Sequence, residues 1–269
     1  MYTSFYGMNS NPFIKEETFK YPLESEDYKE MLSRLNYIKE IRGIGVFYGD
    51  NGLGKTYAVK SFIQSLNKDL YKIIYISSTL NMSVFDFFVA IAKELDLDTG
   101  PCYKTEMFSS IQNEIIRMVN QDKMEVIVII DDAHLLSRDI LLNLKIFYDF
   151  EMNSKDFVSL ILVGQEELKI ELKKTIHTSL NQRINANYKF HGLSRSEVKE
   201  YINSRLEIVN ANKNIFEIEA LNSLYSCSKS SIRRLNTLVI NCLIFGFQLN
   251  KPIIDNEIVM MAKSEMDLS

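Results

Sequence analysis

The sequence predicts an α/β domain with a mainly parallel sheet, followed by a small all-helical domain. Short apolar runs rich in β-branched and aromatic residues alternate with longer amphipathic stretches, and this alternation stops after residue 191. Strands that are apolar at consecutive positions are buried on both faces, as parallel sheets covered by crossover helices require. We therefore expect one domain over residues 1–191 and a second over residues 192–269.

Each expected element of the first domain has a pattern of its own. The expected strands are GVFYG from Gly45, KIIYIS from Lys72, EVIVII from Glu125 and VSLILVG from Val158. The expected helices between them are YAVKSFIQSLNKDL, SVFDFFVAIAKEL and MFSSIQNEIIRMVNQ, which repeat apolar residues at helical spacing. This order predicts three layers, with helices on both faces of the sheet.

The second domain contains only helical patterns. Ser194 and Glu197 have the spacing of a capping box, which opens the helix SEVKEYINSRLEIV. Three further helical segments are expected, near Phe216, Ser231 and Asn256. The most apolar run of the chain, TLVINCLIFGF, is far shorter than the roughly 20 residues that cross a bilayer, so it predicts a buried helix.

Composition and charge exclude several classes of protein. The chain of 269 residues is 46% apolar, which is ample for a packed core. Its net charge of -4 argues against a surface that is basic throughout, although a local basic strip could still bind nucleic acid. Cys102, Cys227 and Cys242 are odd in number and lack metal-ligand spacing, so neither a disulfide framework nor a zinc site is expected. We expect a cytoplasmic protein with no membrane partner.

The segment GDNGLGKT, Gly49 to Thr56, comes directly after one expected strand and opens the next helix, which is the context that gives the pattern G-x-x-x-x-G-K-[ST] its meaning. Its glycines allow successive N–H groups to point at phosphate oxygens, next to the positive end of the helix. We expect Lys55 to reach the β and γ phosphates and Thr56 to bind Mg²⁺. The alternative is a glycine turn before an ordinary helix. The nucleotide contacts predicted here are Gly49, Asp50, Asn51, Gly52, Leu53, Gly54, Lys55, Thr56 and the adjacent Tyr57.

The stretch VIVIIDDAHLL places two aspartates at the end of a buried strand. We expect Asp131 to hold Mg²⁺ through water or through Thr56. Asp132 is placed to orient and partly deprotonate an attacking water, and the alternative is an N-cap for a helix that begins near Leu135. His134 is expected to be a packing or hydrogen-bonding residue.

Together, several motifs resemble one branch of the AAA+ ATPases, which holds the ExeA-type secretion ATPases and the transposon target-selection ATPases of the TnsC and MuB types. The matching segments, in the family's order, are YTSFYGMNSNPF, GDNGLGKT, VIVIIDDAHLL, LILVGQEELKIEL, LNQRINANYKFHGLSRSEVKEYINSRLEIV and SIRRLN. They span nearly the whole chain. The resemblance implies a P-loop AAA+ domain followed by a helical lid, with ATP as the nucleotide.

The resemblance also implies roles for single residues. Gln165 matches the first sensor, which touches the γ-phosphate or the attacking water; from the residues alone it could instead cap the next helix. Arg183 in LNQRI matches the arginine finger, which enters the neighbouring subunit's site, with a surface salt bridge as the alternative. Phe13 of NPF is implied to be an apolar wall for adenine, whereas the sequence alone indicates only an apolar anchor in a loop.

Two positions depart from the family's pattern. Arg233 matches the second sensor, but Ser231 and Ile232 stand where the family has Gly and Pro, so Arg234 remains the alternative. Asp132 stands where family members carry Glu. A catalytic group displaced by about 1 Å can lose on the order of 10²-fold in rate. Slow hydrolysis, or a nucleotide switch that mainly controls assembly, therefore stays open.

The choice within the branch depends on how the chain ends. An ExeA-type secretion protein would continue beyond the ATPase module into a membrane span, and this chain stops at Ser269, which favours the transposition type. That type would form an ATP-dependent homo-oligomer, a ring or a filament, on duplex DNA and deliver this DNA to a transposase. DNA phosphates could be contacted by Lys104, Arg138 and Lys145, although scattered cations are usually solvated surface. The alternatives are a secretion or protein-remodelling ATPase and a slow-hydrolysing switch.

Overall fold

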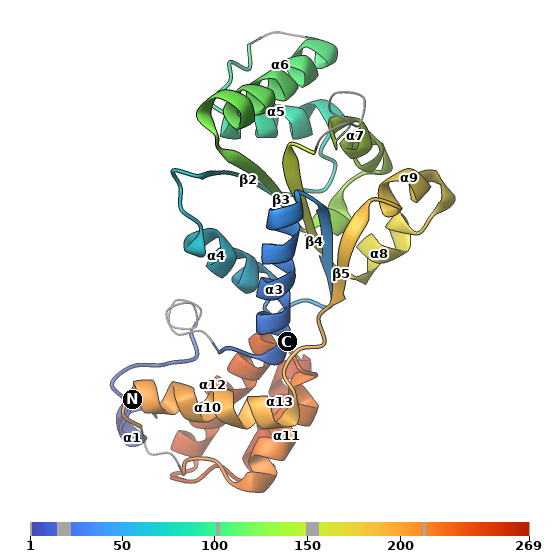
Figure 1. Ribbon diagram of the computed structural model, residues 1–269. Helices are drawn as coiled ribbons and strands as arrows, with labels where there is room; N and C mark the ends of the chain where they lie inside the picture. The colour runs from blue at the N-terminus through green and yellow to red at the C-terminus, as the bar shows by residue number, and fades with distance from the viewer. Residues whose placement is uncertain (1, 15–22, 101–102, 149–155, 212–213, 269) are drawn as a thin grey trace. The chain divides into compact units, whose positions relative to one another are not determined.

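The computed structural model describes residues 2–14, 23–100, 103–148, 156–211 and 214–268 (Figure 1). These residues form two compact units. The first, here the helical unit, comprises Met1–Lys29, Asn51–Gly54 and His191–Ser269, and the second, the sheet unit, comprises Glu30–Asp50 and Lys55–Phe190. The first 29 residues thus group with the C-terminal helices, which the division into 1–191 and 192–269 does not anticipate. That division stays a prediction.

The sheet unit is built on one parallel sheet in the order β2-β3-β4-β1-β5. The strands are β1 (Ile44–Tyr48), β2 (Tyr71–Ser77), β3 (Glu125–Asp131), β4 (Val158–Gly164) and β5 (Ile184–Lys189). The predicted parallel sheet is therefore confirmed. The strand β5 is not predicted by the sequence pattern, because this edge strand, INANYK, buries only Ala186 and lacks the continuous apolar run of a central strand.

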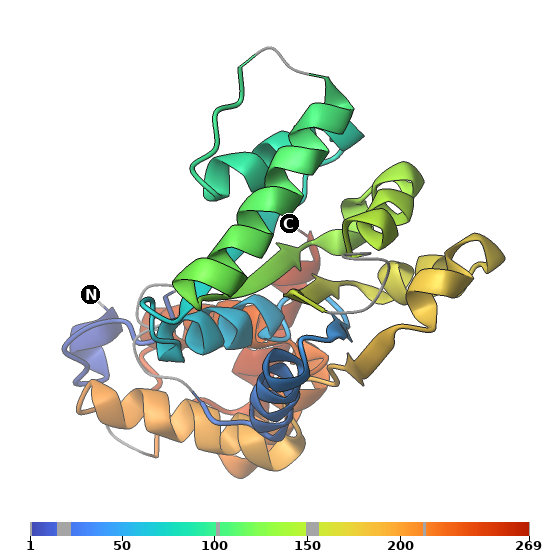
Figure 2. The ribbon, with the colours of Figure 1, turned by 45° about the horizontal axis from the view of Figure 1, so that its top comes forward.

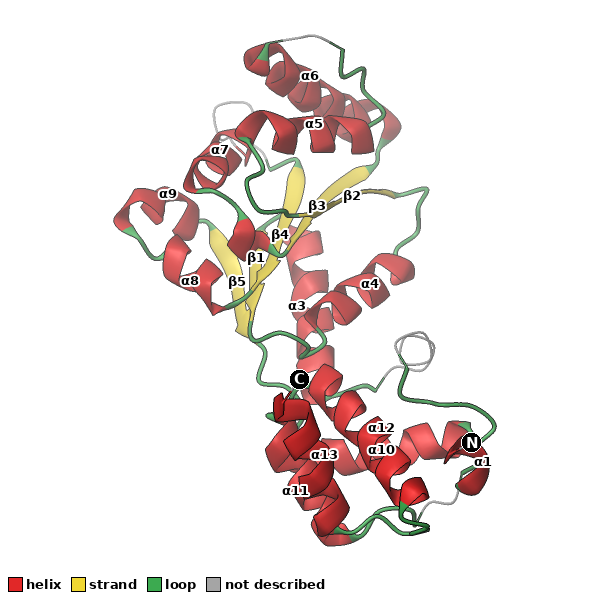
Figure 3. Cartoon of the chain, turned by 180° about the vertical axis from the view of Figure 1, so that it is seen from behind, coloured by secondary structure: helices red, strands yellow, loops and turns green. Residues whose placement is uncertain are grey.

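Helices cover both faces of this sheet (Figure 3). On one face lie α3 (Glu26–Ile41) and α4 (Lys55–Ser65), and on the other lie α5 (Val84–Glu94), α7 (Arg138–Tyr148), α8 (Glu166–Leu172) and α9 (Thr178–Asn181). Both faces of the central strands are buried, as the strand pattern predicts: Val128 faces the second group of helices, and its neighbours Ile127 and Ile129 are equally inaccessible. The three expected layers are present.

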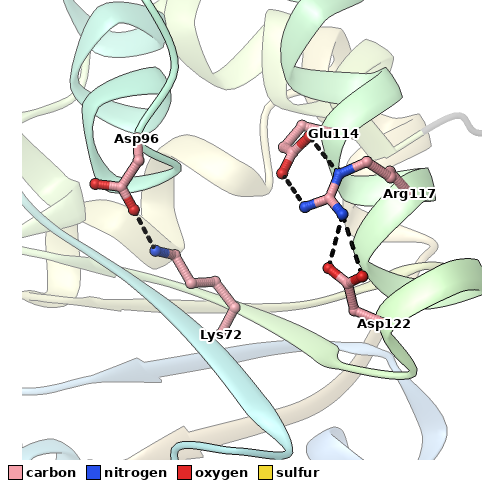
Figure 4. A network of polar contacts seen from close by, with 5 residues as sticks. All are labelled: Lys72, Asp96, Glu114, Arg117 and Asp122. Atoms are coloured by element: carbon pink, nitrogen blue, oxygen red, sulfur yellow. Dashed lines mark hydrogen bonds and ion pairs between the residues drawn. The ribbon is translucent and has the colours of Figure 1, made fainter.

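Between β2 and β3, α5 packs against α6 (Lys104–Arg117) as a helical pair beside the sheet (Figure 2). The last turn of α6 widens into a single π-helical turn, Met118–Asp122, and Lys123 then stops the helix in the left-handed conformation. Arg117 forms ion pairs with Glu114 at 2.7 Å and with Asp122 at 2.9 Å, so its guanidinium joins the regular helix to the π turn (Figure 4). These contacts hold the junction that leads into β3.

The helical unit has its own core. Its helices are α1 (Tyr2–Phe5), α10 (Arg195–Ile208), α11 (Ile218–Ser228), α12 (Ile232–Gln248) and α13 (Asn256–Leu268). The predicted capping box is confirmed, because Ser194 Oγ accepts from the Glu197 amide and the Glu197 carboxylate accepts from the Ser194 amide. The apolar run TLVINCLIFGF lies within α12 and contributes Leu238, Val239 and Cys242 to this core. In the described part of the chain, no helix has both the length and the apolar character needed to span a membrane.

Candidate nucleotide-binding site

The phosphate-loop segment leaves β1 at Gly49 and enters α4 at Lys55. Gly52 and Gly54 have φ angles of 79° and 105°, which residues with a side chain rarely adopt, so the curl of this loop depends on both glycines. Lys55 is 9% exposed, and its Nζ donates to the carbonyl oxygens of Gly49 and Asp50, each at 2.7 Å. The ammonium group is thereby held at the start of the loop.

The tip of the loop, Asn51–Gly54, packs against the start of α12 inside the helical unit. Ser231 Oγ donates to the Asn51 carbonyl and the Arg233 amide donates to the Gly52 carbonyl, both at 3.3 Å. A Cβ atom on Gly52 would lie 2.6 Å from Ser231 Oγ, so this glycine is required for its close contact as well as for its backbone angle.

At the end of β3, Asp131 is 4% exposed, and its carboxylate accepts three hydrogen bonds. Its Oδ2 accepts from Thr56 Oγ1 at 2.9 Å and from Tyr75 Oη at 2.8 Å, and its Oδ1 accepts from the Asp132 amide at 3.0 Å. The structure therefore brings together Thr56 and Asp131, which the sequence analysis assigned to one Mg²⁺ site. Burial, together with the smaller effect of the hydrogen bond to Asp131, raises the pKa of Tyr75, so its hydroxyl keeps its proton and acts as the donor.

Asp132 lies in a different environment from Asp131. It is exposed and takes the left-handed conformation with φ 52°, and its carboxylate does not cap the short 3₁₀ helix Ala133–Leu135 that comes next. The next α-helix, α7, begins only at Arg138. Asp132 therefore occupies the N-cap position of this short helix without capping it through its side chain, and its carboxylate is open to solvent.

Gln165, at the end of β4, forms a polar contact with the turn after β3. Its Nε2 lies 2.8 Å from His134 Nε2, and its side chain does not cap α8. Gln165 thus occupies the N-cap position of α8 without a side-chain capping hydrogen bond, and His134 is the hydrogen-bonding residue that the sequence predicts. His134 Nδ1 is buried and has no hydrogen-bond partner among the described residues.

A family model matches just under half of the chain. Residues 38–170, called the AAA domain below, are similar to the AAA domain family. The match begins in α3 and ends in α8, so it contains the phosphate loop, both aspartates and Gln165. The resemblance to AAA+ ATPases is therefore confirmed at the level of the domain, while the transposition-type assignment stays a prediction.

A curated relative extends beyond the AAA domain. The chain is 30% identical over 250 residues to the general secretion pathway protein A of Aeromonas hydrophila, which covers 92% of this chain and 45% of that protein. The chain thus spans less than half the length of this relative.

Several solved structures have a similar fold over nearly the whole chain. Cdc6p from Pyrobaculum aerophilum has a TM-score of 0.70 at 14% identity, covering 94% of this chain and 71% of that one. The ORC1 protein of Aeropyrum pernix, solved in complex with DNA, has a TM-score of 0.68 at 16% identity, covering 96% and 70%. The ORC2 protein of the same organism, in ADPNP–ADP complexes, has a TM-score of 0.69 at 14% identity, covering 96% and 72%. The predicted P-loop AAA+ fold, with a parallel sheet and a helical C-terminal part, is confirmed.

Two contacts within the sheet unit were not found from the sequence. Lys169 of α8 donates to the hydroxyl of Tyr48, the last residue of β1, and its Nζ lies 4.5 Å from the centre of that ring. Lys189 forms an ion pair with Glu166 at 2.9 Å, which raises the pKa of Lys189. These contacts tie α8 to β1 and β5. They join residues far apart in the sequence, so no local pattern reports them.

Five further residues with predicted roles have no described contact with Thr56 or Asp131. Arg183 is half-buried in the turn before β5, and Arg138 is exposed at the start of α7. Phe13 is 2% exposed in the core of the helical unit, where its ring packs edge-to-face with Tyr201 at 6.5 Å between centroids. The side chains of Lys104 and Lys145 lie outside the described residues. The functional roles of all five stay predictions.

The two arginines of SIRRLN differ in their contacts. Arg234 donates to the Cys227 carbonyl at 3.3 Å and pairs with Asp267 at 3.2 Å, so its guanidinium is used within the helical unit. Arg233 is exposed. The assignment of the second sensor to Arg233 stays a prediction.

The oxygen ligands present in the AAA domain fit Mg²⁺. Within the described ranges, no cluster of three or more His, Cys, Asp or Glu side chains could hold a metal ion. The Thr56 hydroxyl and the Asp131 carboxylate are hard oxygen ligands, and Mg²⁺ usually takes one or two such protein groups together with waters and substrate phosphates. A divalent ion here would therefore be held together with a nucleotide.

Proposed function

We propose that this chain is an ATPase that binds ATP with Mg²⁺ through the loop Gly49–Thr56 and hydrolyses it. The contact between Thr56 Oγ1 and Asp131 Oδ2 carries the proposal. Because the Thr56 hydroxyl donates its hydrogen to Asp131, the lone pairs of Oγ1 are free for a cation. ATP is favoured over GTP because no guanine-reading N-K-x-D segment is suitably placed and because the similar ORC2 structure was solved with ADPNP and ADP.

The remaining roles are assigned from charge and reach. Lys55 neutralises the β and γ phosphates, and Tyr57 contacts the nucleotide next to the loop. For Phe13, which packs in the core of the helical unit, a role at adenine rests on the sequence resemblance alone. Bound Mg²⁺ supplies further charge neutralisation at the phosphates. Asp132 orients the attacking water and accepts its proton, and Gln165 hydrogen-bonds to that water or to the γ-phosphate. Arg233 supplies a further positive charge as the second sensor.

We also propose that ATP drives assembly into a homo-oligomer on duplex DNA, with Arg183 entering the neighbouring subunit's site. Support comes from the similar ORC1 structure, which was solved with DNA. Arg138, exposed at the start of α7, is the described candidate for a phosphate contact, with Lys104 and Lys145 as the other two. Contacts to phosphates would make binding indifferent to sequence and strongly dependent on salt.

Delivery of this DNA to a transposase is the finer form of the proposal and rests on the sequence resemblance alone. The relative from Aeromonas hydrophila keeps a secretion or protein-remodelling role open, since its name places it in a secretion pathway. A slow-hydrolysing switch is the third candidate, because Asp132 is shorter than the glutamate of the family. A cytoplasmic location also stays a prediction.

Steady-state phosphate release, measured with and without duplex DNA at two salt concentrations, tests these proposals together. We expect slow basal turnover that DNA stimulates at low salt, with electron microscopy showing oligomers only when ATP or an analogue is present. Turnover that ignores DNA would favour the protein-remodelling role. Absence of turnover under all conditions, with nucleotide still bound, would favour the switch.

A further inference from the structure

The Asp131 carboxylate has almost no hydrogen-bonding capacity left. An ionised carboxylate offers about four lone-pair positions, two on each oxygen. Thr56 Oγ1 and Tyr75 Oη fill both positions on Oδ2, at 2.9 and 2.8 Å, and the Asp132 amide fills one on Oδ1 at 3.0 Å. By this count, only one position, on Oδ1, remains for any other ligand.

Tyr75 reaches this carboxylate from the edge strand β2. In the parallel pairing of β2 with β3, Tyr75 lies opposite Ile129 and Ser77 lies opposite Asp131. Tyr75 is therefore two residues behind Asp131 on the same face of the sheet, a step of about 6.6 Å along a strand. Only a long side chain spans this step, and the hydroxyl at the tip of the phenol ring makes the contact.

We propose that Tyr75 is a positioning residue for the metal site, because its hydroxyl closes Oδ2 of Asp131 and leaves Oδ1 as the one oxygen open to a divalent cation or its water. This inference rests on the proposed Mg²⁺–ATP site. A carboxylate closed on one oxygen cannot bind a cation in bidentate fashion. It suits Mg²⁺, which keeps its waters, and disfavours Ca²⁺, which readily takes bidentate carboxylates. Tyr75 would therefore set metal selectivity as well as carboxylate orientation.

The experiment measures binding rather than turnover. A fluorescent non-hydrolysable ATP analogue is titrated onto the full chain in EDTA, in Mg²⁺ and in Ca²⁺, for the wild type and for Tyr75→Phe. Phenylalanine keeps the ring and removes only the hydroxyl. We expect unchanged affinity in EDTA, an apparent Mg²⁺ affinity about tenfold weaker, as is common when a residue supporting a metal ligand is lost, and a reduced preference for Mg²⁺ over Ca²⁺.

Tyr6→Phe is the matched control. The Tyr6 hydroxyl donates to the Lys251 carbonyl at 3.1 Å within the helical unit, so this change also removes one tyrosine hydrogen bond. We expect it to leave all three titrations at wild-type values, and thermal unfolding of both variants reports whether they are folded.

Three outcomes would overturn the proposal. If Tyr75→Phe leaves the Mg²⁺ and Ca²⁺ titrations unchanged, the tyrosine only packs against the sheet. If it weakens binding equally in EDTA and in Mg²⁺, its role is structural. If the wild type binds nucleotide with no metal dependence, or does not bind it, the proposed function fails together with this inference, and that result is distinct from the first two because it concerns the wild type.

Discussion

Asp131 and Asp132 are neighbours in sequence, yet the regions around them are built in opposite ways. Asp131 is buried at the end of β3, and three donors hold its carboxylate. Asp132 is exposed, and its side chain makes no hydrogen bond within the described part of the chain. The first carboxylate is held in one orientation and the second is free to reach a substrate. The two adjacent carboxylates therefore lie in two different environments, one held by donors and one open to solvent.

The backbone explains this difference. Asp131 continues β3, so its side chain obeys the alternation of the strand, whereas Asp132 turns the chain into the left-handed region with φ 52°. Aspartate and asparagine adopt this conformation more readily than longer side chains do. The short residue at position 132 therefore suits its backbone conformation, although it gives up about 1 Å of reach compared with glutamate.

The largest effect should come from the phosphate loop beside the held carboxylate. Lys55→Ala should weaken nucleotide binding about 1000-fold, because two charge-assisted contacts to phosphate, each of roughly 2 kcal/mol, are lost. Isothermal titration with an ATP analogue measures this. Lys60→Ala, on an exposed lysine of the same helix, should bind normally. Retention of wild-type affinity in Lys55→Ala would refute the assignment of the loop.

The next largest effect is expected at Asp132, whose carboxylate is open to solvent. Asp132→Asn should lower the turnover number about 100-fold, the low end of the range for general-base groups, while nucleotide affinity stays unchanged. Asparagine tolerates the left-handed conformation, so the backbone is preserved. Phosphate release measures the effect, with Asp139→Asn, an exposed aspartate at the start of α7, as the control. Unchanged turnover would mean that Asp132 has no role in catalysis.

Sequence patterns predicted the central part of the fold and of this site for a physical reason. Buried strands carry continuous apolar runs, and the phosphate loop depends on glycines at fixed spacing, so β1, β3, β4 and the loop were recognised. The edge strand β2 was recognised as well, because KIIYIS is rich in β-branched and aromatic residues, whereas the edge strand β5 was missed because INANYK has no such run and buries only Ala186.

Pairings between distant residues could not be predicted in the same way. Tyr75 looked like an ordinary strand residue, because its contact with Asp131 depends on the register of β2 against β3. The contact of His134 with Gln165 likewise joins residues from two different loops. Such pairings depend on tertiary structure, which no local pattern reports. The residues that belong to a sequence motif, such as Asp131, were therefore predicted, whereas the contacts that Tyr75 and His134 make with site residues were not.

The contact between His134 and Gln165 supports a prediction with a smaller expected effect. If His134 orients the Gln165 amide, the effects of His134→Ala and Gln165→Ala on turnover should not add. We expect a coupling energy of about 1 kcal/mol, so that the double variant is several-fold faster than the product of the two single effects predicts. The pair Gln165→Ala and Arg138→Ala, which share no contact, should give additive effects. Additivity in the first cycle would mean that Gln165 acts without His134.

The smallest effect is expected at Glu114, a hydrogen-bonded carboxylate that lies away from the phosphate loop. The hydrogen bonds from Arg117 lower the pKa of Glu114 below its ordinary value (Figure 4). A carboxylate with a lowered pKa in the folded state adds stability that is complete above the unfolded-state pKa and is lost as the pH falls through the folded-state pKa. Glu114→Gln should therefore lower the melting temperature slightly at pH 7, and this effect should shrink as the pH falls through the lowered pKa of Glu114.

Asp96→Asn is the control for this last comparison. Asp96 also forms an ion pair, with Lys72 at 3.2 Å, but its side chain is 88% exposed, so its contribution at pH 7 should be smaller still. Both variants should bind and hydrolyse nucleotide at wild-type rates, because neither carboxylate lies beside the loop. A loss of Mg²⁺-dependent binding in Glu114→Gln would show that carboxylates away from the loop also contribute to nucleotide binding. If both variants bind nucleotide as the wild type does, then among these carboxylates only Asp131 contributes to nucleotide binding through the donors that hold it, which are Thr56 of α4, Tyr75 and the Asp132 amide.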